Sequence, residues 1–382
     1  MSLRTWIHRA RDLGASDLHV EAGTPPVVRV RGVLHSIGEP VAAAGVEQDA
    51  RALLGAEAWA HLLARGSADA SLELGGTRCR INVYRTIRGL ALAVRLLAPS
   101  VKGLRECNLH PDLRRLTAAP TGLAIVSGPT GSGKSTTLAA LIEEINSAEA
   151  KNVISLESPV EYVFANRRSL IRQREIPTHS PSFEQAIVDA LRENPDVLVI
   201  GEMRTPEVMR LTLNAAETGH LVLATMHSAS CAEALTRICM SFPAEIQGNI
   251  RAQLADCLVG VVCQRLDYLP EYRLRVPRCE MLWGTLAARA TVRSGQMSHI
   301  SNVIQSGGED GMWNFDRYQR WMEQKKDWVR SDSLGSGSDL PASAAPMTSV
   351  PATPPAARGS ISIEEVMDIE ELADLARQIE KR

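Results

Sequence analysis

Residues 128–135 combine the residue types and the spacing needed to bind a nucleotide phosphate. They read Gly-Pro-Thr-Gly-Ser-Gly-Lys-Ser, fit the pattern G-x-x-x-x-G-K-[ST], and stand between an apolar run and a helical pattern. Glycines let backbone N–H groups close around a β-phosphate, and the positive end of the following helix favours the same charge. We expect Lys134 to contact the β- and γ-phosphates and the Ser135 hydroxyl to bind Mg2+. The expected ligands are therefore ATP and Mg2+, held by Gly128, Pro129, Thr130, Gly131, Ser132, Gly133, Lys134, Ser135 and Thr136.

Two short apolar runs end in carboxylates. Glu157 ends the run 153–157, with Glu161 after the following proline, and Glu202 follows the run 197–200. Ligands bind at the carboxyl ends of strands in an open α/β sheet, and phosphoryl transfer needs an acid to hold Mg2+ or to orient water. We expect Glu157 and Glu202 to be catalytic and Glu202 to share Mg2+ with Ser135. The sequence leaves open which of the two glutamates orients the water.

A third apolar run, 221–226, ends in His227. A histidine at this edge of the sheet could contact the γ-phosphate and respond to its loss. His227 is therefore a further candidate catalytic residue, whereas His220, at the start of the same run, is not.

The chain divides into segments of different character. Residues 1–98 predict a small α/β domain, with a helix over 3–13, a helical stretch over 47–64 and strand-like runs at 78–84 and 90–96. Residues 99–116 form a connector. Strands alternate with helices over 117–330, which predicts a mainly parallel sheet covered by helices, an α/β fold.

The last two segments differ from the rest in composition. Residues 331–359 are rich in Ser, Pro, Ala and Gly, as in a flexible linker. Residues 360–382 predict an acidic amphipathic helix that begins with a capping box at Ser362 and Glu365. Either this helix is a solvated end, or it docks on a partner subunit or on a basic groove of a platform protein in the membrane.

Composition excludes several classes of protein. The net charge is −2, and no basic stripe with interleaved aromatic residues supports binding to nucleic acid. No apolar run approaches the roughly 20 residues of a membrane span, and the first residues do not resemble a secretion signal. The seven cysteines form no Cys-x-x-Cys pair, which is typical of a reducing compartment. We expect a cytoplasmic protein without a transmembrane segment, which would be docked peripherally if it works at a membrane.

Four further stretches extend the pattern around the phosphate loop. They are Ala15-Ser-Asp-Leu-His19, Leu156-Glu-Ser-Pro-Val-Glu-Tyr162, Asp196–Arg204 and Gly219–His227. Together they resemble the secretion ATPase superfamily, and most closely the PilT-type retraction ATPases of type IV pili, up to about Trp328. The resemblance implies a RecA-like P-loop NTPase domain with a smaller N-terminal PAS-like domain that packs on the neighbouring subunit of a homo-hexamer. It also implies that the first domain supplies arginines to a nucleotide, matching Arg78, Arg80 and Arg95 here.

What the resemblance implies about function is ATP-driven retraction of a type IV pilus, which produces twitching motility. The implied partners are the inner-membrane pilus platform protein and a paralogous motor ATPase. Two departures leave alternatives open: Ser158 stands where the family usually has aspartate, and Ala287–Ser294 keeps two arginines of a retraction motif but not its apolar positions. The alternatives are an ATPase of a type IVB secretion system and an accessory pilus-motor subunit with weak hydrolysis. An assembly or type II secretion ATPase fits less well, because the chain lacks the four-cysteine motif usual in that group.

Overall fold

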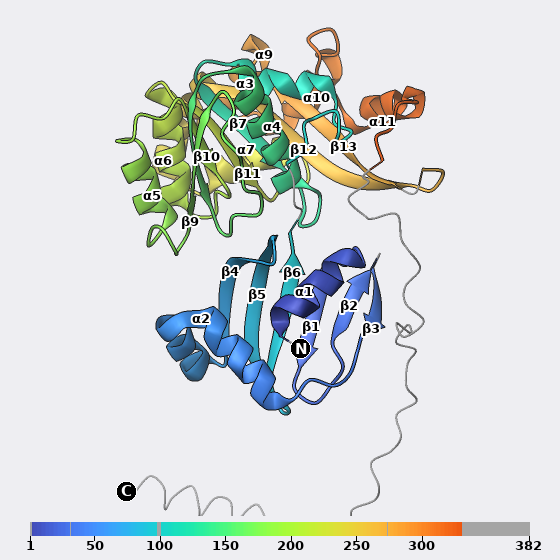
Figure 1. Ribbon diagram of the computed structural model, residues 1–382. Helices are drawn as coiled ribbons and strands as arrows, with labels where there is room; N and C mark the ends of the chain where they lie inside the picture. The colour runs from blue at the N-terminus through green and yellow to red at the C-terminus, as the bar shows by residue number, and fades with distance from the viewer. Residues whose placement is uncertain (1, 31, 98–100, 273, 331–382) are drawn as a thin grey trace, which may run out of the picture.

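The computed structural model describes residues 2–30, 32–97, 101–272 and 274–330. These residues form two sheets, and each sheet has its own hydrophobic core (Figure 1). The predicted linker and the predicted acidic helix, residues 331–382, lie outside the described residues. No helix among the described residues is both long and apolar enough to cross a membrane.

The smaller half is a six-stranded antiparallel sheet in the order β3-β2-β1-β6-β5-β4. Alternating residues point to one face, where Leu18, Val94 and Ile81 lie side by side on adjacent strands and are almost fully buried. Both helices bury their apolar stripes on that face, which leaves the opposite face open. The elements are α1 (Leu3–Asp12), β1 (Asp17–Glu21), β2 (Val27–Val30), β3 (Val33–Ser36), α2 (Ala43–Arg65), β4 (Ser67–Leu74), β5 (Thr77–Thr86) and β6 (Gly89–Leu96).

The larger half is a seven-stranded sheet in the order β13-β12-β7-β11-β10-β8-β9. All neighbouring strands are parallel except β12 and β13, which form a long antiparallel pair. The strands are β7 (Gly122–Ser127), β8 (Asn152–Glu157), β9 (Leu170–Glu175), β10 (Val197–Ile200), β11 (Leu221–Met226), β12 (Leu258–Leu269) and β13 (Leu274–Trp283). Every residue of β7, β10 and β11 is buried, which confirms the mainly parallel sheet predicted from the short apolar runs.

Helices lie on both faces of this sheet (Figure 1). Several begin at side chains that cap them: the hydroxyls of Ser182, Thr205 and Ser230 each accept a hydrogen bond from a backbone N–H in the first turn. The helices are α3 (Arg115–Ala118), α4 (Lys134–Ala148), α5 (Phe183–Ala190), α6 (Pro206–Glu217), α7 (Cys231–Met240), α8 (Ala244–Cys257), α9 (Leu286–Ser294), α10 (Ile300–Ser306) and α11 (Phe315–Gln324).

The stretch 99–116, expected to be a connector, contributes to the larger core. Leu104, Leu109, Leu113 and Leu116 are 3% exposed or less and pack in that core. Residues 111–114 form a short 3-10 helix that leads into α3. The described part of the connector is thus an integral part of the larger half, because its leucines recur at intervals of three to five residues and are all buried in that core.

Candidate functional site

The phosphate loop joins β7, in the middle of the sheet, to α4. Gly128, Gly131 and Gly133 have φ values of 149°, 77° and 87°, which side chains rarely allow. A Cβ on Gly128 would also lie 2.3 Å from the backbone oxygen of Gln264, so this position needs glycine for space as well. The Ser132 hydroxyl is buried in the loop with no hydrogen-bond partner. The loop is thus shaped for close backbone approach and keeps an unused polar group.

Gln264 on β12 fixes the loop from behind. Its Nε2 donates to the Ser132 backbone oxygen at 2.5 Å, and its Oε1 accepts from the Thr137 hydroxyl at 2.6 Å. Gln264 is 1% exposed. Sequence reasoning missed this residue, although a glutamine directly after the apolar run 258–263 was a signal, since buried polar groups need partners.

Lys134, His227 and Glu202 form a chain of contacts at the carboxyl ends of β7, β11 and β10. The Lys134 ammonium donates to the backbone oxygens of Gly128 at 2.8 Å and Pro129 at 3.0 Å, and lies 3.3 Å from His227 Nδ1. His227 Nε2 lies 3.0 Å from Glu202 Oε1. A neutral imidazole with its proton on Nε2 satisfies both contacts, because it accepts from the lysine and donates to the glutamate. The histidine therefore links the phosphate-loop lysine to a carboxylate.

Charge in this chain of contacts is set by burial and pairing. Burial acts to raise the pKa of Glu202, but the hydrogen bond from Arg204 and the nearby His227 outweigh it and lower that pKa below its usual value. Arg204 Nη2 lies 2.6 Å from Glu202 Oε2. Burial lowers the pKa of Lys134, and the carboxylates of Glu202 and Glu161 oppose that effect. Glu202 is thus held as a carboxylate near the phosphate loop.

Glu157 stands in a different environment. Its Oε1 accepts hydrogen bonds from the Ser155 hydroxyl at 2.6 Å and from Gln173 Nε2 at 3.1 Å. Burial raises its pKa, and the two hydrogen bonds only partly offset that effect. Gln173 lies on β9, a strand that the sequence did not predict, and it also donates to the Tyr162 backbone oxygen and accepts from the Phe164 N–H. One glutamine therefore fixes both the carboxylate and the loop that follows it.

That loop places two more side chains against α4. The Ser135 hydroxyl donates to Glu161 Oε1 at 3.1 Å, and Thr136 Oγ1 lies 2.8 Å from the Tyr162 hydroxyl. Glu161 followed the predicted strand end in the sequence but was not selected as a site residue. The Ser135 hydroxyl and the Glu161 carboxylate are hard oxygen donors, the kind that Mg2+ prefers. The residues present fit a magnesium ion at this point.

A pocket of about 240 Å³ lies beside the loop. Gly133, Thr136 and Thr137 line it on the side of α4, and Gln264 lines it from β12. Leu109, Leu266, Leu274 and Pro277 add apolar surface, and Arg275 is the charged group on the β13 side. Its position next to the phosphate loop and its apolar walls suit a flat heterocyclic base.

Comparison with known proteins gives the family. A model of the type II/IV secretion system protein family matches residues 2–302. The type IV pilus retraction ATPase PilT of Pseudomonas aeruginosa is 36% identical over 305 residues, which cover 79% of this chain and 88% of PilT. The chain belongs to the type II/IV secretion system protein family. Membership in this family makes it a P-loop ATPase, as the sequence predicts.

Two solved structures extend the comparison to the fold. A pilus retraction motor PilT with bound ADP has a TM-score of 0.79 and 31% identity, with 89% of this chain and 98% of that chain covered. The Legionella pneumophila ATPase DotB has a TM-score of 0.69 and 25% identity, with 84% and 94% covered. The predicted α/β fold class, a RecA-like ATPase domain with a smaller N-terminal domain, is confirmed by the first match.

The three arginines of the smaller half have different surroundings in this chain. Arg78 Nη2 lies 2.8 Å from Glu175 Oε2 on β9, and Glu175 is paired with Glu157 across β8 and β9. Arg80 on β5 and Arg95 on β6 lie opposite each other in the strand register, on the open face of the smaller sheet. Arg95 Nε donates to Asp17 Oδ1 at 3.0 Å. Of the three, Arg78 thus contacts the larger half of the same chain.

Proposed function

We propose that the protein is a hexameric motor that couples ATP hydrolysis to retraction of a type IV pilus. It works on the cytoplasmic side of the inner membrane, against the pilus platform protein and beside a paralogous motor ATPase. The observation that carries this proposal is the phosphate loop with two carboxylates at neighbouring strand ends, in a chain that matches the PilT motor over 89% of its length.

The contacts support different roles for the two glutamates. Glu202, held ionised by Arg204 and His227, would bind Mg2+ together with Ser135 and Glu161. Bound Mg2+ neutralises charge on the phosphate oxygens. Glu157, buried and oriented by Ser155 and Gln173, would accept a proton from the attacking water. The proposal thus assigns the two roles that the sequence left open.

Lys134 and His227 support a link between the nucleotide and the protein around it. The Lys134 ammonium contacts two loop carbonyls and His227. A bound triphosphate would compete for the same N–H groups, because a charged oxygen is a stronger acceptor than a carbonyl. Release of the histidine would then free it to contact the γ-phosphate. The base of ATP would occupy the pocket of about 240 Å³.

Assembly into a hexamer is supported by the open face of the smaller sheet. Arg80 and Arg95 are exposed there, next to each other, and could reach the nucleotide of a neighbouring subunit. We expect Arg95→Ala to lower ATP turnover at concentrations where the protein is assembled, without weakening nucleotide binding. Arg29→Ala is the matched control, because Arg29 lies on β2, next to the same Asp17 with which Arg95 pairs. Equal losses in both variants, or full activity of a monomer shown by light scattering, would contradict the proposal.

The direction of force needs a measurement in cells. In a host that makes type IV pili, we expect deletion of the gene to leave pili on the surface but to stop their retraction. The wild-type gene should restore retraction, and a Lys134→Ala gene should not. Loss of the pili themselves would indicate an assembly motor, and loss of protein export with normal pili would indicate a secretion ATPase.

A further inference from the structure

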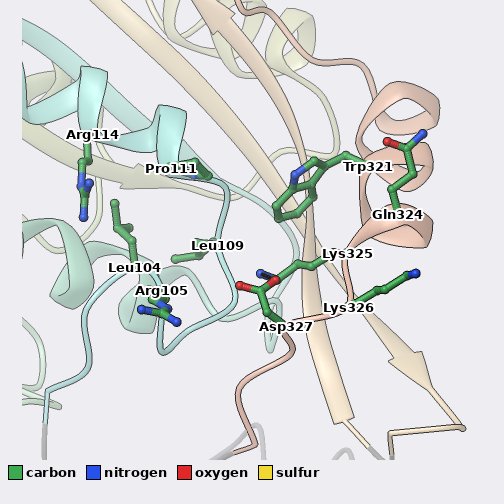
Figure 2. A pocket seen from close by; sticks show the side chains of 10 residues that line it. All are labelled: Leu104, Arg105, Leu109, Pro111, Arg114, Trp321, Gln324, Lys325, Lys326 and Asp327. Atoms are coloured by element: carbon green, nitrogen blue, oxygen red, sulfur yellow. Dashed lines mark hydrogen bonds and ion pairs between the residues drawn. The ribbon is translucent and has the colours of Figure 1, made fainter.

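A second, larger pocket of about 580 Å³ lies in the larger half, between two segments that are far apart in the sequence (Figure 2). One wall is the stretch 104–114, and the other is the end of α11 with the residues that follow it. None of its lining residues belongs to the phosphate loop or to the strand ends of the nucleotide site. The lining residues are Leu104, Arg105, Leu109, Pro111, Arg114, Trp321, Gln324, Lys325, Lys326 and Asp327.

The pocket combines apolar surface with an excess of positive charge. Pro111 is exposed and Trp321 is half-buried, so both offer apolar contact. The lining residues include four cationic side chains and one carboxylate. Arg114 pairs with Glu144 and Lys325 with Asp327, whereas Arg105 and Lys326 are exposed on the rim. Such a surface suits a ligand that carries both apolar and acidic groups, because each kind of contact alone would be weak in water.

The chain itself contains a segment of this chemistry. Residues 360–382 place Val366, Ile369, Leu372, Ala376 and Ile379 at helical spacing. The acidic residues of this segment outnumber its basic ones: Glu364, Glu365, Asp368, Glu370, Glu371, Asp374 and Glu380 against Arg377, Lys381 and Arg382. Its charge is therefore opposite to that of the pocket, and its apolar positions could contact Trp321 and Pro111.

The connection between pocket and segment is short. The described chain ends at Arg330, three residues after Asp327 on the pocket wall. Residues 331–359 separate the two, and a coil-like chain of that length spans about 30 Å. A tether of this kind holds its end at an effective concentration of about a millimolar, so even weak contacts are occupied.

We propose that this pocket is the docking site for the acidic segment 360–382 of the same chain. The proposal does not depend on the function proposed above. The docked segment would lie on the outer side of the stretch 104–109. That stretch also lines the pocket beside the phosphate loop, where the Asn108 carboxamide makes two hydrogen bonds of 2.8 Å with the Val329 backbone. The tail would thus pack directly behind one wall of the nucleotide site.

Zero-length carbodiimide cross-linking of the full chain tests this docking, since the reagent joins only amines and carboxyls already in contact. The sequence contains six lysines, Lys102, Lys134, Lys151, Lys325, Lys326 and Lys381, so the products are few and assignable by mass spectrometry. We expect Lys326 to join acids between Glu364 and Asp374. In 1 M salt, where charges are screened beyond about 3 Å, this product should lose most of its intensity.

Variants and isotope mixing decide between the possible occupants. Arg105→Glu, on the rim opposite Lys326, should strongly reduce the Lys326 product, whereas Lys151→Gln should not, because Lys151 lies elsewhere and pairs with Glu149. Both residues lie at the surface or in surface pairs, and unchanged circular dichroism checks folding. In a mixture of heavy and light protein, products within one chain support the proposal. Products only between chains, products that join Lys326 to residues 1–98, or a tail cross-linked equally to Lys151 would each overturn it.

Discussion

Replacing Lys134 by alanine is expected to lower ATP turnover at least about 100-fold, the loss typical when one preorganised charged donor is removed from a reacting centre. The lysine is held at the phosphate loop by the Gly128 and Pro129 carbonyls, so it needs little rearrangement to meet a phosphate. Affinity for ATP should fall as well, because the β- and γ-phosphates lose their only loop cation. Phosphate release and equilibrium binding of a fluorescent ATP analogue measure the two effects.

The fold should survive this change, since the ammonium contacts loop carbonyls and His227 rather than the core. Lys151→Ala is the matched control: it removes a lysine of the same half that pairs with surface Glu149. Thermal unfolding of both variants should occur near the wild-type temperature. A folded Lys134→Ala protein with normal turnover would show that the nucleotide reacts elsewhere.

Replacing each of the two glutamates by glutamine should have a different effect on binding and hydrolysis. We expect Glu157→Gln to bind ATP normally but to hydrolyse it about 100- to 10,000-fold more slowly, the range for loss of a positioned base. Glu202→Gln should slow hydrolysis and also raise the Mg2+ concentration needed for it, because Mg2+ would lose the carboxylate ligand that Arg204 and His227 keep ionised. Glu193→Gln, which alters a carboxylate paired with Arg174 outside the site, should leave both properties unchanged.

The pH dependence gives an independent check on Glu157. Burial raises its pKa above the usual value of about 4.3, and the ionised form is the one that can accept a proton. As the pH is lowered, turnover should therefore begin to fall at a higher pH than it would if Glu157 had the usual pKa of a glutamate. Glu157→Gln should lack this acid limb in its residual activity. Normal turnover in both glutamate variants would remove the catalytic assignment.

The sequence predicted those parts of the site that depend on one short segment. The phosphate loop, β10 and β11 follow from local patterns. The spacing of the glycines indicates the turn between a strand and a helix, and a fully apolar run indicates a buried strand. Placing Glu157, Glu202 and His227 at one edge needed only the rule that parallel strands end together.

The parts that escaped prediction depend on which segments become neighbours. Gln264 supports the phosphate loop because β12 lies beside β7, and Gln173 orients Glu157 because β9 lies beside β8. The strand β9, Leu-Ile-Arg-Gln-Arg-Glu, is an edge strand in which the last four residues are polar, so its sequence lacks the apolar signal of the central strands. Glu161 reaches Ser135 only because that loop turns back onto α4. A local pattern can show that a buried polar residue needs a partner, but it does not show which segment provides that partner.

The most direct test of the account is the identity of the nucleotide that stays bound after incubation with Mg-ATP. Rapid filtration followed by chromatography of the extracted nucleotide compares wild-type protein with Glu157→Gln. The account predicts ADP on the wild-type protein and intact ATP on the variant. Intact ATP on the wild-type protein, or ADP formed on Glu157→Gln at the wild-type rate, would contradict it.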